Sequence, residues 1–150
     1  FGIPRDRRKS DNFGMKAFMH RPNRWDKMLN RTSRWRIDTY IYNDLPFMNR
    51  CNKALTDEYP KMTMFGETWV HGVPNQSYFV ENNYNIPFKS NLQAATDFQT
   101  LCGITEALTK NFGWTDGVNK LYTTLAQDFV YKDPMRNVIF LDNFLLFPNK

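Results

Sequence analysis

The alternation of short strand patterns with a helical pattern is the feature that most constrains how this chain folds. Apolar and polar residues alternate over Trp35–Tyr40, which predicts a strand, and a second strand is predicted at Lys61–Gly66. Between them we expect a helix that Asn43 or Asp44 caps and Pro60 ends. Its apolar stripe consists of Leu45, Met48, Cys51 and Leu55. Strands that alternate with helices favour a parallel sheet with right-handed crossovers.

The second half of the chain continues this alternation. A polar loop over residues 71–91 precedes a short strand at Leu92–Thr96 and a helix near Phe98–Lys110. Asp116 is expected to cap a further helix, whose apolar stripe consists of Val118, Leu121, Tyr122, Leu125 and Phe129. The apolar run Asn137–Leu141 predicts a last strand that is buried on both faces. We therefore predict an α/β chain with four parallel strands.

Charge divides the chain into two parts. Residues 1–36 hold eleven Lys or Arg and three Asp, a net charge of +8, whereas the whole chain carries +5. Such a basic segment is compatible with binding to nucleic acid or to an anionic surface, but a solvated end of the chain is favoured over both, since no nucleic-acid-binding motif accompanies it. We expect an irregular basic segment at residues 1–34 and one folded domain at residues 35–150.

The remaining composition excludes several classes of site. Cys51 and Cys102 lack the spacing of metal ligands, and we expect both to be buried free thiols, although a disulfide between them stays open. No apolar run reaches membrane-spanning length, and no signal peptide is visible, so the compartment is not readable. Aromatic residues make up 16% of the chain; we favour a core role for them over sugar-binding platforms.

Two carboxylates are predicted at the carboxyl ends of parallel strands, the edge at which α/β proteins carry their active clefts. Asp38 follows Trp35-Arg36-Ile37, and Glu67 follows Phe65-Gly66. A carboxylate pair about 5 Å apart performs retaining glycoside hydrolysis, with one group as nucleophile and the other as acid/base. Neighbouring strands about 4.8 Å apart can bring them that close. The alternative is that each acidic residue caps the helix after its strand.

The wording around these residues resembles a known family. Trp35-Arg36-Ile37-Asp38-Thr39-Tyr40 resembles the nucleophile motif of glycoside hydrolase family 13, the α-amylase family, and Phe65-Gly66-Glu67-Thr68-Trp69 resembles its acid/base motif. Val138-Ile139-Phe140-Leu141-Asp142-Asn143 resembles the approach to its last conserved motif. The wording is most similar to the bacterial neopullulanase or cyclomaltodextrinase type. The resemblance covers residues 33–143 and implies strands four to seven of a (β/α)8 TIM barrel.

The resemblance also implies roles for individual residues. Asp38 becomes the nucleophile and Glu67 the acid/base, while Arg36 keeps the nucleophile ionised, or is a simple strand salt bridge. The implied substrate-binding residues are Arg36, Tyr40, Trp69, His71 and Asn143. Tyr40 either lines the cleft or packs beside Asp38, and Trp69 either stacks on a glucosyl ring or packs at the barrel rim. Calcium is a cofactor of many family members, but its usual ligands cannot be placed in this sequence. A periplasmic or secreted bacterial location accords with the resemblance.

The sequence departs from the family at several points. Phe144 and Leu145 stand where the family has a His-Asp pair, so the transition-state aspartate is missing. Ser33-Arg34 stands in place of the usual Asp-Gly. A full barrel needs about 250 residues, so we expect a truncated or decayed product, or one half of something larger. Its exposed barrel edge would invite self-association.

Three hypotheses follow from the sequence. The leading one is a retaining hydrolase of α-1,4-glucans such as maltodextrin, pullulan or cyclodextrin, in fragmentary form and weak or inactive alone. The second is a non-catalytic remnant that binds oligosaccharide through Trp69 and its neighbours. The third is a basic module that binds nucleic acid through residues 1–36. The first two imply an α-glucan partner, with neither nucleic acid nor a membrane.

Overall fold

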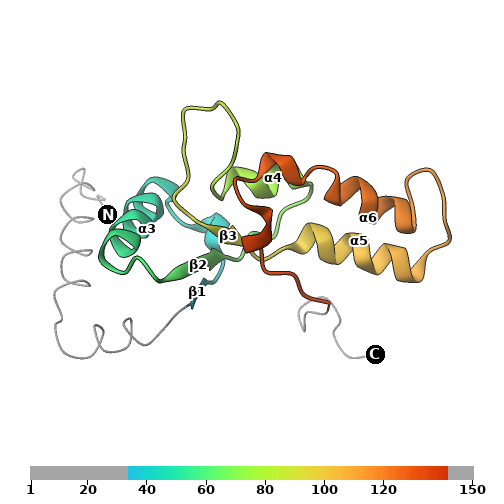
Figure 1. Ribbon diagram of the computed structural model, residues 1–150, viewed down its shortest axis with the longest axis horizontal. Coiled ribbons are helices and arrows are strands. Elements are labelled where there is room, and N and C mark those ends of the chain that lie inside the picture. Colours follow the sequence, from blue (N-terminus) through green and yellow to red (C-terminus); the bar gives the residue numbers. More distant parts are fainter. Residues whose placement is uncertain (1–33, 142–150) are drawn as a thin grey trace, which may run out of the picture.

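The computed structural model describes residues 34–141, which form a mixed α/β fold around a three-stranded parallel sheet (Figure 1). The strands are β1 (Arg34–Ile37), β2 (Thr63–Gly66) and β3 (Ala94–Ala95), in the spatial order β1-β2-β3. The prediction of an α/β chain with parallel strands is confirmed. Except for Arg34, the expected basic segment 1–34 lies outside the described residues.

The helices alternate with these strands along the chain until the last two α-helices, which follow each other with no strand between them. The α-helices are α3 (Leu45–Glu58), α4 (Val73–Tyr78), α5 (Phe98–Thr109) and α6 (Val118–Leu125). Short 3-10 turns lie at η1 (Tyr40–Tyr42), η2 (Asp128–Val130) and η3 (Pro134–Arg136). In Figure 1, α3 lies beside the sheet, whereas α5 and α6 run side by side away from it. The molecule is therefore elongated.

Helix α3 forms as its sequence predicts. The Asp44 carboxylate accepts a hydrogen bond from the backbone N–H of Phe47 at 2.9 Å, which caps the first turn, and Pro46 occupies a position in that turn. The helix ends at Glu58, just before Pro60. Its apolar stripe packs on the sheet, where Leu55 is 1% exposed. This packing fixes one face of β1 and β2 against a helix.

Alternate residues of β1 and β2 face this core. The core members with the least exposure are Tyr40, Leu55, Met64, Val80, Leu92 and Ala95, and Trp35 and Ile37 pack against them. Gly66 permits the closest approach in this cluster. A Cβ atom at Gly66 would lie 2.8 Å from both Tyr40 Cγ and Leu92 Cδ2, closer than carbon atoms pack. The last residue of β2 must therefore be a glycine for the Tyr40 ring to pack here.

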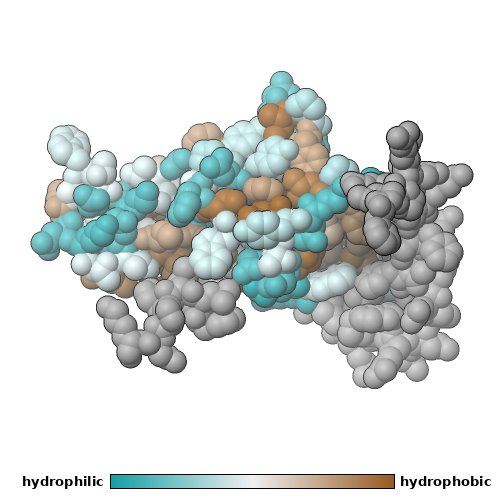
Figure 2. Space-filling model, turned by 180° about the vertical axis from the view of Figure 1, so that it is seen from behind, coloured by the Kyte–Doolittle hydropathy of each residue, from teal (hydrophilic) through white to brown (hydrophobic). Residues whose placement is uncertain are grey.

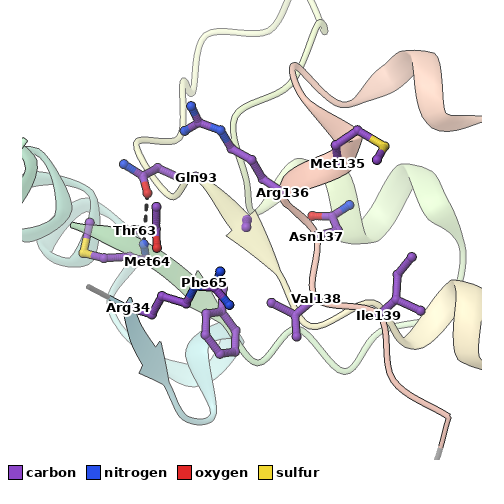
Figure 3. Close-up of a pocket in the computed structure, with 11 residues that line it drawn as sticks. Arg34, Thr63, Met64, Phe65, Gln93, Met135, Arg136, Asn137, Val138 and Ile139 are labelled. Carbon is purple, nitrogen blue, oxygen red and sulfur yellow. Dashed lines mark hydrogen bonds between the residues drawn. The ribbon is translucent and has the colours of Figure 1, made fainter. Parts of the chain in front are cut away.

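The other face of the sheet is open among the described residues. Arg34, Arg36 and Thr63 are exposed on it, and Phe65 is half-buried. A pocket of about 410 Å³ lies over the amino ends of the strands, between this face and the segment Met135–Ile139 (Figure 3). At its rim the Gln93 side-chain oxygen accepts a hydrogen bond from the backbone N–H of Met64 at 2.9 Å. This pocket lies at the end of the strands opposite to Asp38 and Glu67.

The expected last strand, Asn137–Leu141, is wrong as a strand. Val138 makes a single parallel bridge to Thr96, and its N–H and C=O bond to the Ala95 carbonyl and the Asp97 N–H, each at 2.9 Å. Ile139 is 58% exposed and Leu141 72% exposed, so this run is not buried on both faces. The segment takes the expected place beside β3, but no strand among the described residues covers its outer side.

Three other expectations need correction. The region 71–91 is not all loop, because α4 forms within it after Gly72, whose φ of 87° no branched residue adopts easily. Asp116 does not cap α6; the N-cap is Gly117, with φ 62° and the Asn111 carbonyl oxygen 2.6 Å from where a Cβ would stand. Cys102 is exposed rather than buried, and both cysteines are free.

We predict that Gly66→Ala lowers the free energy of unfolding by about 1–3 kcal/mol, because the added methyl group overlaps the Tyr40 ring and Leu92. Chemical denaturation monitored by circular dichroism measures the change. Gly113→Ala is the matched control, since its Cβ meets nothing closer than 3.6 Å. Equal effects of the two substitutions would contradict the packing argument.

Candidate active site

The structure brings Asp38 and Glu67 to the same guanidinium group. Arg36 Nη1 donates to Asp38 Oδ1 at 2.8 Å, and Arg36 Nη2 pairs with Glu67 Oε1 at 3.1 Å. The parallel register sets this meeting, because Ile37 at the end of β1 lies opposite Gly66 at the end of β2. Each carboxylate follows the last residue of its strand. The two carboxylates therefore lie at the carboxyl edge of the sheet, as the sequence predicts.

The two carboxylates have different surroundings. The Asp38 side chain is 68% exposed, whereas the Glu67 side chain is 7% exposed. An exposed ion pair such as Arg36–Asp38 contributes about 0–1 kcal/mol, but a buried carboxylate without a partner is costly. Arg36 therefore matters more to Glu67, for which it is the counter charge. This arrangement gives one carboxylate open to solvent and one that is enclosed.

A strained backbone at Thr39 supplies the second partner of Glu67. Thr39 has φ 47° and ψ 38°, the left-handed region that β-branched residues avoid, and it is the only non-glycine residue with positive φ between residues 34 and 141. In this conformation its N–H donates to Glu67 Oε2 at 3.0 Å. Two backbone hydrogen bonds connect the segments that follow β1 and β2. Glu67 N–H donates to the Ile37 carbonyl at 2.8 Å, and Tyr40 N–H donates to the Glu67 carbonyl at 3.1 Å. Strain of this kind persists where surrounding contacts fix the backbone.

Tyr40 packs below the site rather than on its surface. Its side chain is 1% exposed, and its hydroxyl accepts a hydrogen bond from Asn52 Nδ2 at 3.0 Å. Burial raises the pKa of the Tyr40 phenol, so the ring stays neutral in the core. Of the two roles expected for Tyr40, the structure places it in the packing one.

Trp69 and His71 lie on the loop after β2, which the start of α5 holds in place. Gln99 accepts a hydrogen bond from Gly72 N–H at 2.7 Å and donates to the Val70 carbonyl at 2.5 Å. The Trp69 ring stacks on Phe98 with centroids 5.2 Å apart and planes 2° apart, and Trp69 remains 42% exposed. His71 is exposed on the same loop. The structure thus presents one fixed, flat and partly exposed indole near the carboxyl edge.

Sequence reasoning missed a third carboxylate at this edge, Asp97 after β3. It is 6% exposed and caps α5, accepting from Thr100 N–H at 3.0 Å and from Thr100 Oγ1 at 2.7 Å. Gln76 Nε2 donates to Asp97 at 3.2 Å and to the Tyr131 hydroxyl at 3.0 Å. The signal for this cap was Asp97 three residues before Thr100. Both Asp97 oxygens accept hydrogen bonds from the first turn of α5, so we expect Asp97 to fix the start of that helix.

The described residues show no cluster of acidic side chains for the calcium that the resemblance implies. Between residues 34 and 141, no three side chains of His, Cys, Asp or Glu are grouped as ligands of a metal ion. Asp38 and Glu67 turn oxygens toward a guanidinium, which does not suit a shared cation. Asn143, Phe144 and Leu145 lie outside the described residues.

No protein-family model matches this chain. Within the described part, no helix is both long enough and apolar enough to cross a membrane.

We predict that Thr39→Gly raises the free energy of unfolding by about 1 kcal/mol, because glycine adopts positive φ without strain while the N–H to Glu67 is kept. Thermal unfolding checks this. The matched control is Thr115→Gly, at an exposed position without positive φ, where we expect no gain in stability. A loss of stability in Thr39→Gly would show that the threonine is not strained.

We predict that Asp128→Asn stabilises the fold at neutral pH. Burial, and then the nearby Asp97 charge, raise the pKa of Asp128 above its ordinary value. At pH above the raised pKa, Asp128 is charged in the folded state, and this charge destabilises the fold. The destabilisation disappears as the pH falls below the pKa that Asp128 has in the unfolded chain. The gain from Asn should therefore shrink between neutral and acid pH in denaturation curves. A gain that does not change with pH would contradict this cause.

Proposed function

We propose that this chain is an α-glucan-active glycoside hydrolase of the α-amylase type, which cleaves α-1,4-glucosidic bonds with retention. In this proposal β1, β2, β3 and the Asn137–Leu141 segment correspond to strands four to seven of a (β/α)8 barrel. The parallel order of the three strands and the position of Val138 beside β3 support that correspondence. The substrates would be maltodextrin, pullulan or cyclodextrin.

One observation carries the proposal. Asp38 and Glu67, from the ends of two adjacent parallel strands, meet on the single guanidinium of Arg36. Carboxylate pairs at this edge of a sheet are the groups that double-displacement glycoside hydrolysis requires.

The chemistry then assigns a step to each group. In the first step Asp38 Oδ attacks the anomeric carbon, the carbon–oxygen bond to the leaving sugar breaks, and the glycosidic oxygen takes up a proton through Glu67 as the general acid. Water next attacks the same carbon, its proton passes to Glu67, and the bond to Asp38 breaks. Exposure favours Asp38 as the nucleophile, because a substrate can reach it. Arg36 holds Asp38 in place through its 2.8 Å contact.

We expect slow turnover. Phe144 and Leu145 have neither a donor for substrate hydroxyls nor a carboxylate for the transition state. Loss of one cooperating catalytic group commonly costs orders of magnitude in rate. A sensitive assay must therefore detect the chemical step itself rather than accumulated product.

A second candidate function is binding of oligosaccharide without catalysis. The observation that favours it is Trp69, whose ring is fixed flat on Phe98 and 42% exposed. Aromatic faces of this kind stack on the apolar faces of sugars. In this alternative the Arg36 contacts with both carboxylates hold the fold together and perform no chemistry.

The decisive experiment uses α-maltosyl fluoride, whose fluoride leaves without a strong acid. We predict that Glu67→Gln accumulates a covalent maltosyl adduct on Asp38, because the first displacement proceeds while the second lacks its base. Intact-mass spectrometry followed by peptide mapping measures the adduct. With maltodextrin, the native chain should release reducing sugar.

The controls separate the two candidates. Asp38→Asn should form no adduct and release no sugar, and Asp44→Asn, at the cap of α3, should behave as the native chain does. No adduct in Glu67→Gln together with Trp69-dependent maltodextrin binding would establish the second candidate instead. Sugar release that survives Asp38→Asn would overturn the proposed nucleophile.

A further inference from the structure

A second pocket lies away from the carboxylate pair, between α4, the chain after it and η2. Its volume is about 830 Å³, within the range of ligand-binding cavities. Four aromatic residues line it, namely Tyr78, Tyr84, Phe88 and Phe129, and neither Asp38 nor Glu67 does. In Figure 1 the chain between α4 and β3 projects from the body of the molecule, and in Figure 2 this projection carries hydrophobic and hydrophilic residues side by side. The pocket is therefore a separate feature of the described surface.

Hydrogen bonds between the three segments build this pocket in advance. Asn82 and Tyr131 form an antiparallel bridge, and Asn83 Nδ2 donates to the Phe129 carbonyl at 2.8 Å. Ser77 Oγ donates to the Tyr84 hydroxyl at 2.8 Å, which ties α4 to the projecting chain. A cavity whose walls are already cross-connected loses little conformational entropy on binding. The pocket is thus formed before a ligand binds, and binding does not require the chain to refold.

The surface chemistry of the pocket points to a neutral ligand. None of its lining residues carries a formal charge, so the lining offers an ionic ligand no counter charge. Tyr78 stacks beside Phe88 with centroids 5.6 Å apart, and Phe129 is 74% exposed. Exposed rings that gather in one patch mark binding sites more than single exposed rings do.

Two amide side chains add polar groups to these rings. Asn75 Nδ2 donates to the His71 carbonyl at 2.7 Å, and Gln127 Nε2 donates to the Thr123 carbonyl at 2.9 Å. These hydrogen bonds use the amide nitrogen of each side chain. The side-chain carbonyl oxygen is an acceptor that suits a ligand hydroxyl group. Ring faces beside acceptors match a pyranose sugar, which has an apolar face and a hydroxyl edge.

We propose that this aromatic pocket binds an α-glucan chain at a second site, distinct from the carboxylate pair. The choice of α-glucan rests on the proposed function, whereas the preference for a neutral sugar rests on the pocket itself. Binding here would hold a long glucan on the protein and raise the local concentration of its other end near the carboxylates, as two linked contacts do.

The test measures maltoheptaose binding to the full chain by titration calorimetry. Phe129→Ala should weaken binding about fivefold, the effect of losing one stacking contact. Because Phe129 is 74% exposed, the substitution should leave the fold intact. The matched control is Phe112→Ala, a ring of 75% exposure that does not line the pocket, which should bind as the native chain does.

The outcomes also separate this inference from the proposed function. Binding that depends on Phe129 and persists in Asp38→Asn and in Trp69→Ala supports the second site even if no maltosyl adduct ever forms. Absence of maltoheptaose binding at millimolar concentration, or an equal loss in Phe112→Ala, overturns it. Binding of neutral detergent in place of maltoheptaose overturns the choice of sugar.

Discussion

The parallel pairing of β1 with β2 is the constraint on which the rest of the site depends. Its register sets Ile37 opposite Gly66, so that the residues that follow each strand emerge at one edge. Burial of Met64 and Leu55 between sheet and helix holds that register, because a shift by one residue would turn the apolar side chains to the open face. The meeting of Asp38 and Glu67 on Arg36 is a consequence of this pairing.

The space below the carboxylates is as constrained as the edge itself. Gly66 lets the Tyr40 ring lie against β2, and the buried ring anchors the turn that contains Thr39. The strained Thr39 backbone then directs its N–H to Glu67. Strain at one residue is sustained by burial at the next, which is how packed structures hold unusual backbone beside polar sites. At the end of β3 a buried carboxylate is likewise held by local contacts, because Asp97 caps α5.

Local sequence patterns predicted those elements that local physics controls. Helix α3 has its cap at Asp44 and its stop near Pro60, because capping groups and a helix-breaking ring act within a few residues. The prediction of a last strand was wrong, because an apolar run such as Asn137–Leu141 forms a strand only where neighbouring strands pair with it. Among the described residues this run has a single bridge, between Val138 and Thr96. Asp116 failed as a cap because the backbone turns at Gly117 instead, where positive φ is needed.

The sequence alone determined the parallel α/β class and the placement of Asp38 and Glu67 at strand ends, since periodicity and chain order carry that information. Only the tertiary structure decided that Arg36 contacts both carboxylates, that Tyr40 is buried and that Glu67 is enclosed while Asp38 is exposed. These features depend on register and packing between segments far apart in the chain, which no local pattern encodes. The aromatic pocket has the same origin, because Tyr78, Phe88 and Phe129 become neighbours only when residues 82–84 pair with residues 129–131.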